Sequence, residues 1–216
     1  MKANQKFQDI LKVSLIYFAR YGYKKTTMED IARELDMTKG ALYLYVKNKK
    51  DLYEKTIAEN LIGWQNKVKE TVDKETDPIT KFIVLSFKAF QYLSENKDLR
   101  QVLVNDPEIF PMFTRHDPYF DINENSREMI KSILREGISK KVFRNVDVDS
   151  IAWLAFSAYK MFIIDTYILT DNDTTWKLFQ DSVELGIYGL LKKPIDIQNI
   201  LIKKGGEIDS HRKHLI

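Results

Sequence analysis

The sequence predicts an all-α protein with a small N-terminal head of three helices and a larger antiparallel helical domain after it. Apolar residues recur at spacings of three and four along most of the chain, and no sustained alternation of apolar and polar residues suggests strands. Only eight glycines and five prolines interrupt the 216 residues. Since 44% of the residues are hydrophobic, the chain can also bury a sizeable core.

The first predicted helix has one apolar stripe, which runs from Ile10 through Val13, Tyr17 and Phe18 to Tyr21. Gly22 follows directly. Glycine adopts the left-handed conformation that ends many helices, so we expect the first helix to stop there.

Two very short helices are predicted next, joined by a tight turn. Thr27 and Asp30 have the spacing of a capping box. Thr38 can cap a second helix that runs to about Tyr45, and Asp36 with Met37 leaves room only for a turn between the two. Two short helices joined this tightly form a helix-turn-helix.

Three Asp-Pro pairs predict further helix starts, because aspartate caps a helix and proline suits its first position. They are Asp77-Pro78, Asp106-Pro107 and Asp117-Pro118.

Two long apolar helices are expected at about 149–169 and 174–191, with Pro194 as a stop. We therefore divide the chain into a helix-turn-helix domain (1–48), a helical domain (49–202) and a frayed tail (203–216).

Positive charge is concentrated in the predicted head, although the net charge of the chain is only +3. Residues 1–60 contain 12 Lys and Arg against 8 Asp and Glu, whereas the remainder is nearly balanced. Residues 38–50 contain four lysines and no acid, which suits a surface facing phosphates. A solvated face is the other interpretation of such a run.

The second helix of the motif has the side chains that major-groove binding requires. Lys39 can reach a guanine edge or a phosphate, the Tyr43 hydroxyl can reach a phosphate, and Gly40 lets the DNA backbone come close. Lys49 stands after Asn48 at the start of the next helix, where an anion is favoured. The candidate DNA contacts are Thr27, Thr38, Lys39, Gly40, Ala41, Tyr43, Leu44, Tyr45 and Lys49.

This head resembles the tetracycline-repressor (TetR) family over about the first quarter of the chain. The resemblance is carried by Gly22-Tyr23, Thr26-Thr27-Met28, Ile31-Ala32, Thr38-Lys39-Gly40, Leu42-Tyr43-Leu44-Tyr45 and Asn48-Lys49 through Leu52. It implies DNA contacts at Thr27, Thr38, Lys39, Tyr43 and Lys49. Two positions of the head depart from the family pattern: Asp36 replaces a common glycine, and Val46 replaces a phenylalanine. Residues 136–147 have a weaker likeness to the family, in which Lys141 replaces another common glycine.

The resemblance implies a homodimeric repressor that binds a pseudo-palindromic double-stranded operator and responds to a small-molecule effector. An apolar or amphipathic effector is expected, since the helical domain is rich in aromatic residues; occupancy would shift the helix from about Lys49 to Val72. The candidate ligand contacts are Trp64, Phe87, Phe90, Tyr92, Phe110, Trp153, Phe156 and Tyr159. The candidate dimer contacts are Ile151, Ala155, Phe162, Trp176, Val183, Gly186, Ile187 and Leu190.

Other classes of protein have less support in the sequence. There is no cysteine, and no P-loop, nucleophile elbow or paired-carboxylate motif appears, so we expect neither an enzyme nor a bound cofactor or metal. His116, His211 and His214 are the three histidines, and we expect no metal site there. Without a secretory signal or an apolar run long enough for a membrane span, the cytoplasm is the expected location. A ligand-independent architectural DNA-binding protein remains an alternative.

Overall fold

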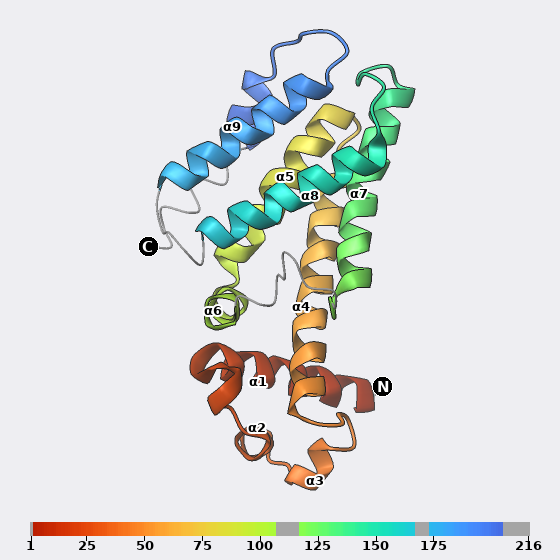
Figure 1. Cartoon of the computed structure of the whole chain (residues 1–216). Coiled ribbons are helices and arrows are strands. Elements are labelled where there is room, and N and C mark those ends of the chain that lie inside the picture. The colour runs from red at the N-terminus through yellow and green to blue at the C-terminus, as the bar shows by residue number, and fades with distance from the viewer. Residues whose placement is uncertain (1, 107–116, 167–172, 205–216) are drawn as a thin grey trace. The chain divides into compact units, whose positions relative to one another are not determined.

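The computed structural model describes residues 2–106, 117–166 and 173–204, which are helical for most of their length (Figure 1). Within these ranges the backbone forms no strand, and the all-α prediction is confirmed. The chain divides into two compact units. The head unit contains Met1–Gly63 and Asn96–Tyr119, and the large unit contains Trp64–Glu95 and Phe120–Ile216.

The head unit is built from α1 (Lys2–Lys25), α2 (Met28–Glu34), α3 (Lys39–Leu42), the first part of α4 (Lys49–Val72) and α6 (Lys97–Asn105). Gly22 adopts a left-handed φ of 75°, as predicted, although helical hydrogen bonding resumes after it as far as Lys25. The centre of this unit is formed by buried side chains from all five helices, among them Phe18, Ile31, Leu42, Leu52 and Leu99.

Helix α6 packs on α1 and is absent from the predicted set of helices. Asn96 caps its start by accepting a hydrogen bond from the Leu99 amide at 3.1 Å. Asp106, which we expected to start a helix, instead ends α6: its amide bonds to the Val102 carbonyl at 2.8 Å. The helix expected after Pro107 lies outside the described residues.

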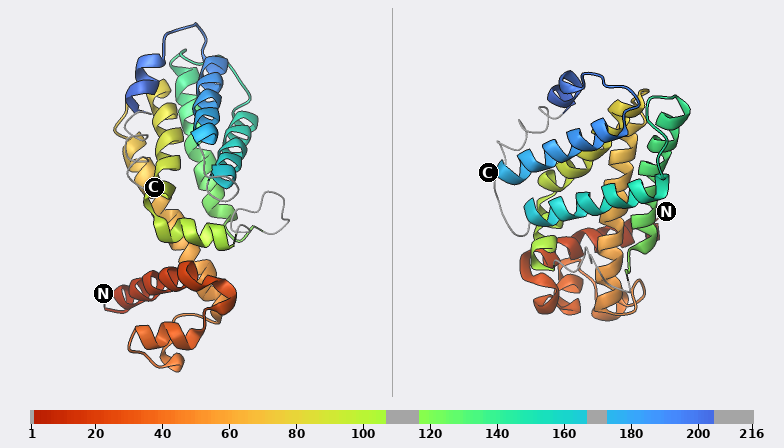
Figure 2. Two further views of the ribbon diagram at one scale, coloured as in Figure 1. Left: turned by 90° about the vertical axis from the view of Figure 1, so that its left-hand side faces the viewer. Right: turned by 45° about the horizontal axis from the view of Figure 1, so that its top comes forward.

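The large unit contains the rest of α4 together with α5 (Pro78–Glu95), α7 (Phe120–Ser139), α8 (Val148–Ile164) and α9 (Asp173–Leu190). Within this unit α5 contacts both α7 and α9, and α7 packs on α8 (Figure 2). The Asp77 carboxylate caps α5 as predicted, accepting the Thr80 amide at 2.8 Å. Helix α7 begins later than predicted, because Asp117 accepts the Tyr119 amide in a turn that precedes it.

The connection from α7 to α8 is held against the end of α9. Lys141 adopts a left-handed φ of 60°, at the position where glycine was the common residue. A Cβ on Gly137 would lie 2.0 Å from the Phe143 ring, so only glycine fits beneath that ring. Phe143 forms a single antiparallel bridge with Leu191.

The end of the described chain is more ordered than we predicted. Residues 198–204 are helical, and the Lys204 ammonium forms an ion pair with Glu75 at 2.7 Å. The predicted frayed tail therefore does not begin at residue 203, and residues 205–216 lie outside the described ranges. Among the helices described, none combines the length and the apolar character that crossing a membrane requires.

Candidate nucleic-acid interface

The start of α2 has the capping arrangement that the sequence predicts. The Asp30 amide donates to the Thr27 hydroxyl oxygen at 3.1 Å, and that hydroxyl donates to the Asp30 carboxylate at 2.6 Å. The Thr27 hydroxyl and the nearby Arg33 guanidinium lower the pKa of Asp30. Met28, Ile31 and Ala32 are buried beneath this turn, so α2 is fixed by its own cap and by the head core.

The turn between α2 and α3 depends on a left-handed aspartate. Asp36 has a φ of 52°, and the next amide, from Met37, returns to the Ala32 carbonyl at 2.9 Å. Thr38 then caps α3 by accepting the Ala41 amide at 3.1 Å. Helix α3 is shorter than predicted, since it ends at Leu42 and continues as turns to Tyr45.

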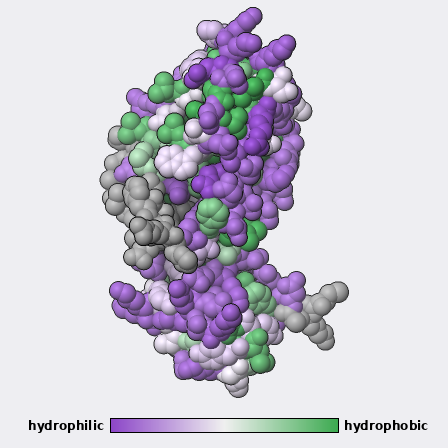
Figure 3. All heavy atoms as spheres, turned by 45° about the vertical axis from the view of Figure 1, so that its right-hand side comes forward, coloured by the Kyte–Doolittle hydropathy of each residue, from purple (hydrophilic) through white to green (hydrophobic). Residues whose placement is uncertain are grey.

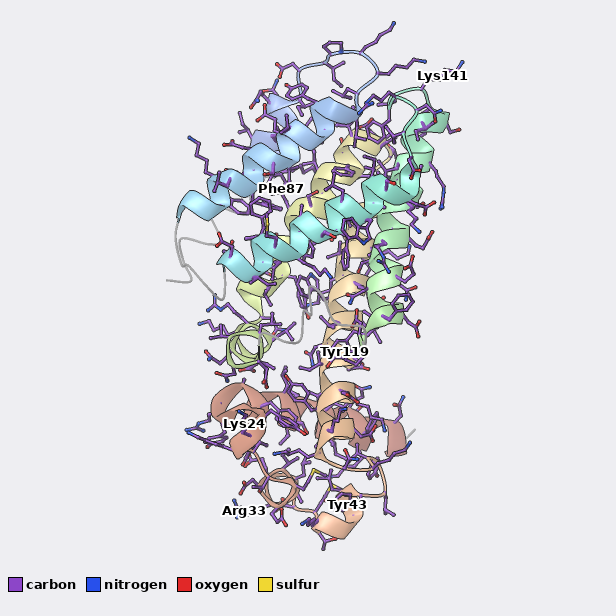
Figure 4. The ribbon with its side chains drawn as sticks, viewed as in Figure 1. Lys24, Arg33, Tyr43, Phe87, Tyr119 and Lys141 are labelled. Atoms are coloured by element: carbon purple, nitrogen blue, oxygen red, sulfur yellow. The ribbon has the colours of Figure 1, made fainter. Side chains whose placement is uncertain are left out.

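Four of the predicted DNA contacts lie on the outer surface of α3 and the turn after it. Lys39 and Gly40 are exposed, the Tyr43 side chain is 42% exposed (Figure 4), and Leu44 is 84% exposed. A Cβ on Gly40 would meet only the Thr38 hydroxyl oxygen, at 3.9 Å. Internal packing of the head therefore does not require glycine there.

Two other predicted contacts, Ala41 and Tyr45, are half-buried. The Tyr45 ring stacks on Phe7 with a centroid distance of 6.2 Å, and Val46 beside it is 3% exposed. This stacking from α1 supplies aromatic packing beneath the motif, where Val46 replaces the phenylalanine of the family pattern. The Tyr45 ring thus supports α3 from within the head.

Lys49 faces inward, contrary to the expected phosphate contact. Its ammonium donates to the carbonyls of Tyr23 at 2.8 Å, Thr26 at 3.1 Å and Lys24 at 3.3 Å, and lies 4.5 Å from the centroid of the Tyr23 ring. This ammonium ties the start of α4 to the end of α1. Its geometry supports a structural role instead of DNA contact.

The predicted effector contacts separate into two aromatic clusters inside the large unit. Trp64 stacks on Tyr92 at 5.6 Å and meets Tyr159 edge-on at 6.2 Å. Phe87 (Figure 4) and Phe90 instead pack against two aromatic rings of α9, Trp176 and Phe179. The spacing of aromatic residues along the sequence does not show which of them belong to which cluster.

Two further predicted effector contacts do not fit an internal site. Trp153 is 60% exposed, because α8 buries Ala152, Phe156 and Ile163 and exposes Trp153, Leu154 and Met161. Trp153 therefore does not face the interior of this unit, and its contact with an effector stays a prediction. Phe110 lies outside the described residues.

Four of the predicted dimer contacts, all on α9, face the interior of the large unit. Trp176, Val183, Ile187 and Leu190 are at most 8% exposed and form part of the core of the large unit. Ile151, Ala155 and Phe162 on α8 are half-buried, and Gly186 is exposed. The outward apolar side chains are Trp153, Leu154 and Met161 of α8 and Leu178, Leu185 and Tyr188 of α9. Figure 3 shows hydrophobic surface interrupting the hydrophilic surface of the large unit.

Comparison with known proteins identifies the head. Residues 10–56 match the family model described as "Bacterial regulatory proteins, tetR family". A curated relative, the HTH-type transcriptional repressor KstR2 of Mycolicibacterium smegmatis, is 27% identical over 164 residues, covering 70% of this chain and 78% of that protein. The fatty acid metabolism regulator protein of Bacillus subtilis is 22% identical, covering 87% and 97%.

Solved structures share the fold over nearly their whole length. A TetR-family regulator from Pectobacterium atrosepticum has a TM-score of 0.74 at 18% identity, covering 90% of this chain and 98% of that one. FadR from Bacillus subtilis in complex with stearoyl-CoA has a TM-score of 0.69 at 18% identity, covering 85% and 99%. With the helix-turn-helix geometry of the head, these similarities show that the chain is a DNA-binding transcriptional regulator whose head, over residues 10–56, matches the tetR family model.

Proposed function

We propose that the chain is a homodimeric repressor that binds a pseudo-palindromic operator through α3 and is released by an apolar or amphipathic effector bound in the large unit. The observation that carries the DNA-binding part is the exposed set Lys39, Gly40, Tyr43 and Leu44. Leu44 in particular has no packing role that would explain an apolar side chain at 84% exposure.

These side chains supply both kinds of contact that operator binding needs. The Tyr43 hydroxyl can donate to a phosphate, and a close backbone approach at Gly40 can position α3 in the groove. Lys39 can donate to guanine O6 and N7, whereas Leu44 can contact only an apolar group. In the major groove that group is the thymine methyl, so we expect an A·T pair opposite Leu44.

The large unit supports an effector with a flat or extended apolar part and a negative charge. The rings of Trp64, Tyr92 and Tyr159 form an aromatic cluster inside this unit, and the Lys67 ammonium lies 5.0 Å from the centroid of the Tyr92 ring. On α8 the Lys160 ammonium lies 5.1 Å from the Phe156 ring. Among the relatives, one FadR structure holds stearoyl-CoA and another protein is a ketosteroid regulator. We therefore expect an acyl thioester or a steroid acid as the class of effector.

A second copy of the chain is the proposed partner of the outward apolar face of α8 and α9, defined by Trp153, Leu154, Met161, Leu178, Leu185 and Tyr188. The rings of Phe162 and Phe179 bring the two helices together, and several large exposed apolar side chains on neighbouring helices mark an interaction site. A two-fold axis through this face would pair two heads, as a pseudo-palindromic operator requires.

Binding to selected DNA tests the proposal. A duplex is selected from a random-sequence pool by repeated binding, and its affinity is measured by fluorescence anisotropy with and without stearoyl-CoA, a 3-ketosteroid acid and free CoA. We expect at least one of the two apolar probes to weaken operator binding and to raise the melting temperature of the protein, whereas free CoA does neither.

Two other results would contradict it. Sequence-insensitive binding with a steep salt dependence would favour an architectural protein. Failure of the selection to enrich any sequence at low salt would argue against operator binding altogether.

A further inference from the structure

The two acids in the first turn of α2 have different partners. Asp30 stays within its own helix, where it accepts the Thr27 hydroxyl and pairs with Arg33 at 2.5 Å. Glu29 instead reaches across to α3 and forms an ion pair with the Lys39 ammonium. The Glu29 and Lys39 side chains are 57% and 48% exposed, so the pair lies on the surface that the proposed function turns toward DNA.

This pair changes what Lys39 can offer to DNA. A lysine without a carboxylate beside it binds phosphates of any sequence and releases counterions as it does so. Beside Glu29 the positive charge of Lys39 is partly offset by the carboxylate, and the hydrogen bond from Lys39 lowers the pKa of Glu29. An ammonium has three N–H donors, however, and the Glu29 oxygen takes one of them. Two donors remain for a base edge.

We propose that Glu29 is a specificity-determining residue, which holds the Lys39 ammonium away from the phosphates of random DNA and leaves it able to donate to a base of the operator. Glu29 acts through Lys39 and positions it. The inference rests on the proposed role of α3 in operator binding. It predicts that Glu29 increases the ratio of operator affinity to random-DNA affinity.

The test compares Glu29→Gln with the wild-type protein on the selected operator duplex and on a random duplex, over a series of salt concentrations. One additional phosphate contact steepens the slope of log K against log salt by about 0.9 and corresponds to a roughly fivefold to tenfold gain near 0.1 M salt. We expect this gain for Glu29→Gln on the random duplex, and less than about a twofold gain on the operator.

Two matched variants separate the effect from charge alone. Glu59→Gln removes one exposed acid from α4 and should produce a much smaller gain, equal on both duplexes. In a Lys39→Gln background, Glu29→Gln should behave like Glu59→Gln, because the residue through which Glu29 acts is gone.

The outcomes also distinguish this inference from the proposed function. If Lys39→Gln leaves operator affinity unchanged, the assignment of α3 as the reading helix is wrong. A second case is that Lys39→Gln weakens operator binding, as proposed, but Glu29→Gln changes the affinity for both duplexes equally. In that case, or if the salt slope for the random duplex is unchanged, only the role of Glu29 is overturned. A gain that persists in the Lys39→Gln background overturns it as well.

Discussion

Lys141 holds a left-handed conformation that an L side chain adopts at a cost of about 1 kcal/mol. Substitution of Lys141 by glycine should therefore raise the free energy of unfolding by roughly that amount, measured by denaturant titration, although the freer unfolded chain offsets part of the gain. Asn145 lies in the same connection without a positive φ, so Asn145→Gly should give no gain. Equal stabilisation by both variants would show that the φ of Lys141 is not the cause.

Substitution of Gly40 should affect the stability of the protein and its affinity for DNA in different ways. Space exists for a Cβ, and alanine favours a helix by up to about 1 kcal/mol, so Gly40→Ala should leave the melting temperature unchanged or raise it. If DNA approaches the backbone there, the same variant should weaken operator binding about tenfold, an effect of about 1.4 kcal/mol. Fluorescence anisotropy on the selected duplex measures this.

Gly63 provides the control, since a Cβ there also meets nothing within 4 Å. Gly63→Ala should stabilise α4 and leave operator affinity as it is. Unchanged operator affinity in Gly40→Ala would mean that this glycine is merely tolerated in α3.

For individual residues, the sequence predicts local features such as helix caps well, but it predicts contacts with distant parts of the chain poorly. The Thr27 and Thr38 caps and the turn at Asp36 depend on neighbours within a few residues, and each is present in the structure. The inward turn of Lys49 depends on the Tyr23 and Lys24 carbonyls of α1, which are more than twenty residues away. The sequence around Lys49 contains no signal for those carbonyls.

Among the helices, Glu136 of α7 provides a test of pH dependence. Lys140, four residues later, and Lys81 of α5 both pair with its carboxylate at 2.6 Å, and they lower its pKa from the ordinary value of 4.5. A lowered pKa in the folded state stabilises the protein above the unfolded-state value, and that contribution disappears as the pH falls through the folded-state value.

Denaturant titrations of wild type and Glu136→Gln should therefore differ by a constant amount above about pH 4.5 and converge below it. Glu70→Gln removes an exposed glutamate of α4 and serves as the control for the loss of one surface charge. A gap between wild type and Glu136→Gln that persists undiminished at low pH would contradict this account.

Helix boundaries and helix faces differ in how well the sequence predicts them. Capping residues predict the starts of α2, α3 and α5 within a residue or so. The sequence does not predict α6, because Asp106-Pro107 has the pattern of a helix start and not of a helix end. Asn96, with Leu99, Val102 and Leu103 at helical spacing, was the available signal. Helices α8 and α9 are apolar on more than one side, so their composition could not show which side forms the core.

In the whole molecule, the outward face of α8 and α9 should control assembly. Leu185 is 75% exposed on that face, and Leu185→Lys should shift the protein from dimer to monomer in sedimentation experiments, because a lysine cannot be buried there without a partner. Operator affinity should fall with it, since two heads no longer bind together.

Ile202→Lys is the matched control, because Ile202 is 67% exposed but lies beyond α9. It should leave the sedimentation behaviour unchanged. A Leu185→Lys protein that sediments as the wild type would place the dimer contact elsewhere.

The head unit is discontinuous in sequence, and this determines how such a head can be exchanged between proteins. The Asn105 amide of α6 donates to the Ala19 carbonyl of α1 at 2.9 Å, and the Tyr53 hydroxyl donates to Asp106 at 3.2 Å. A graft of residues 1–63 alone would leave behind this support together with the buried Leu99, Val102 and Leu103. A working chimaera must therefore carry over two stretches of chain, so recombination with a single crossover after the helix-turn-helix would separate the reading head from part of its own core.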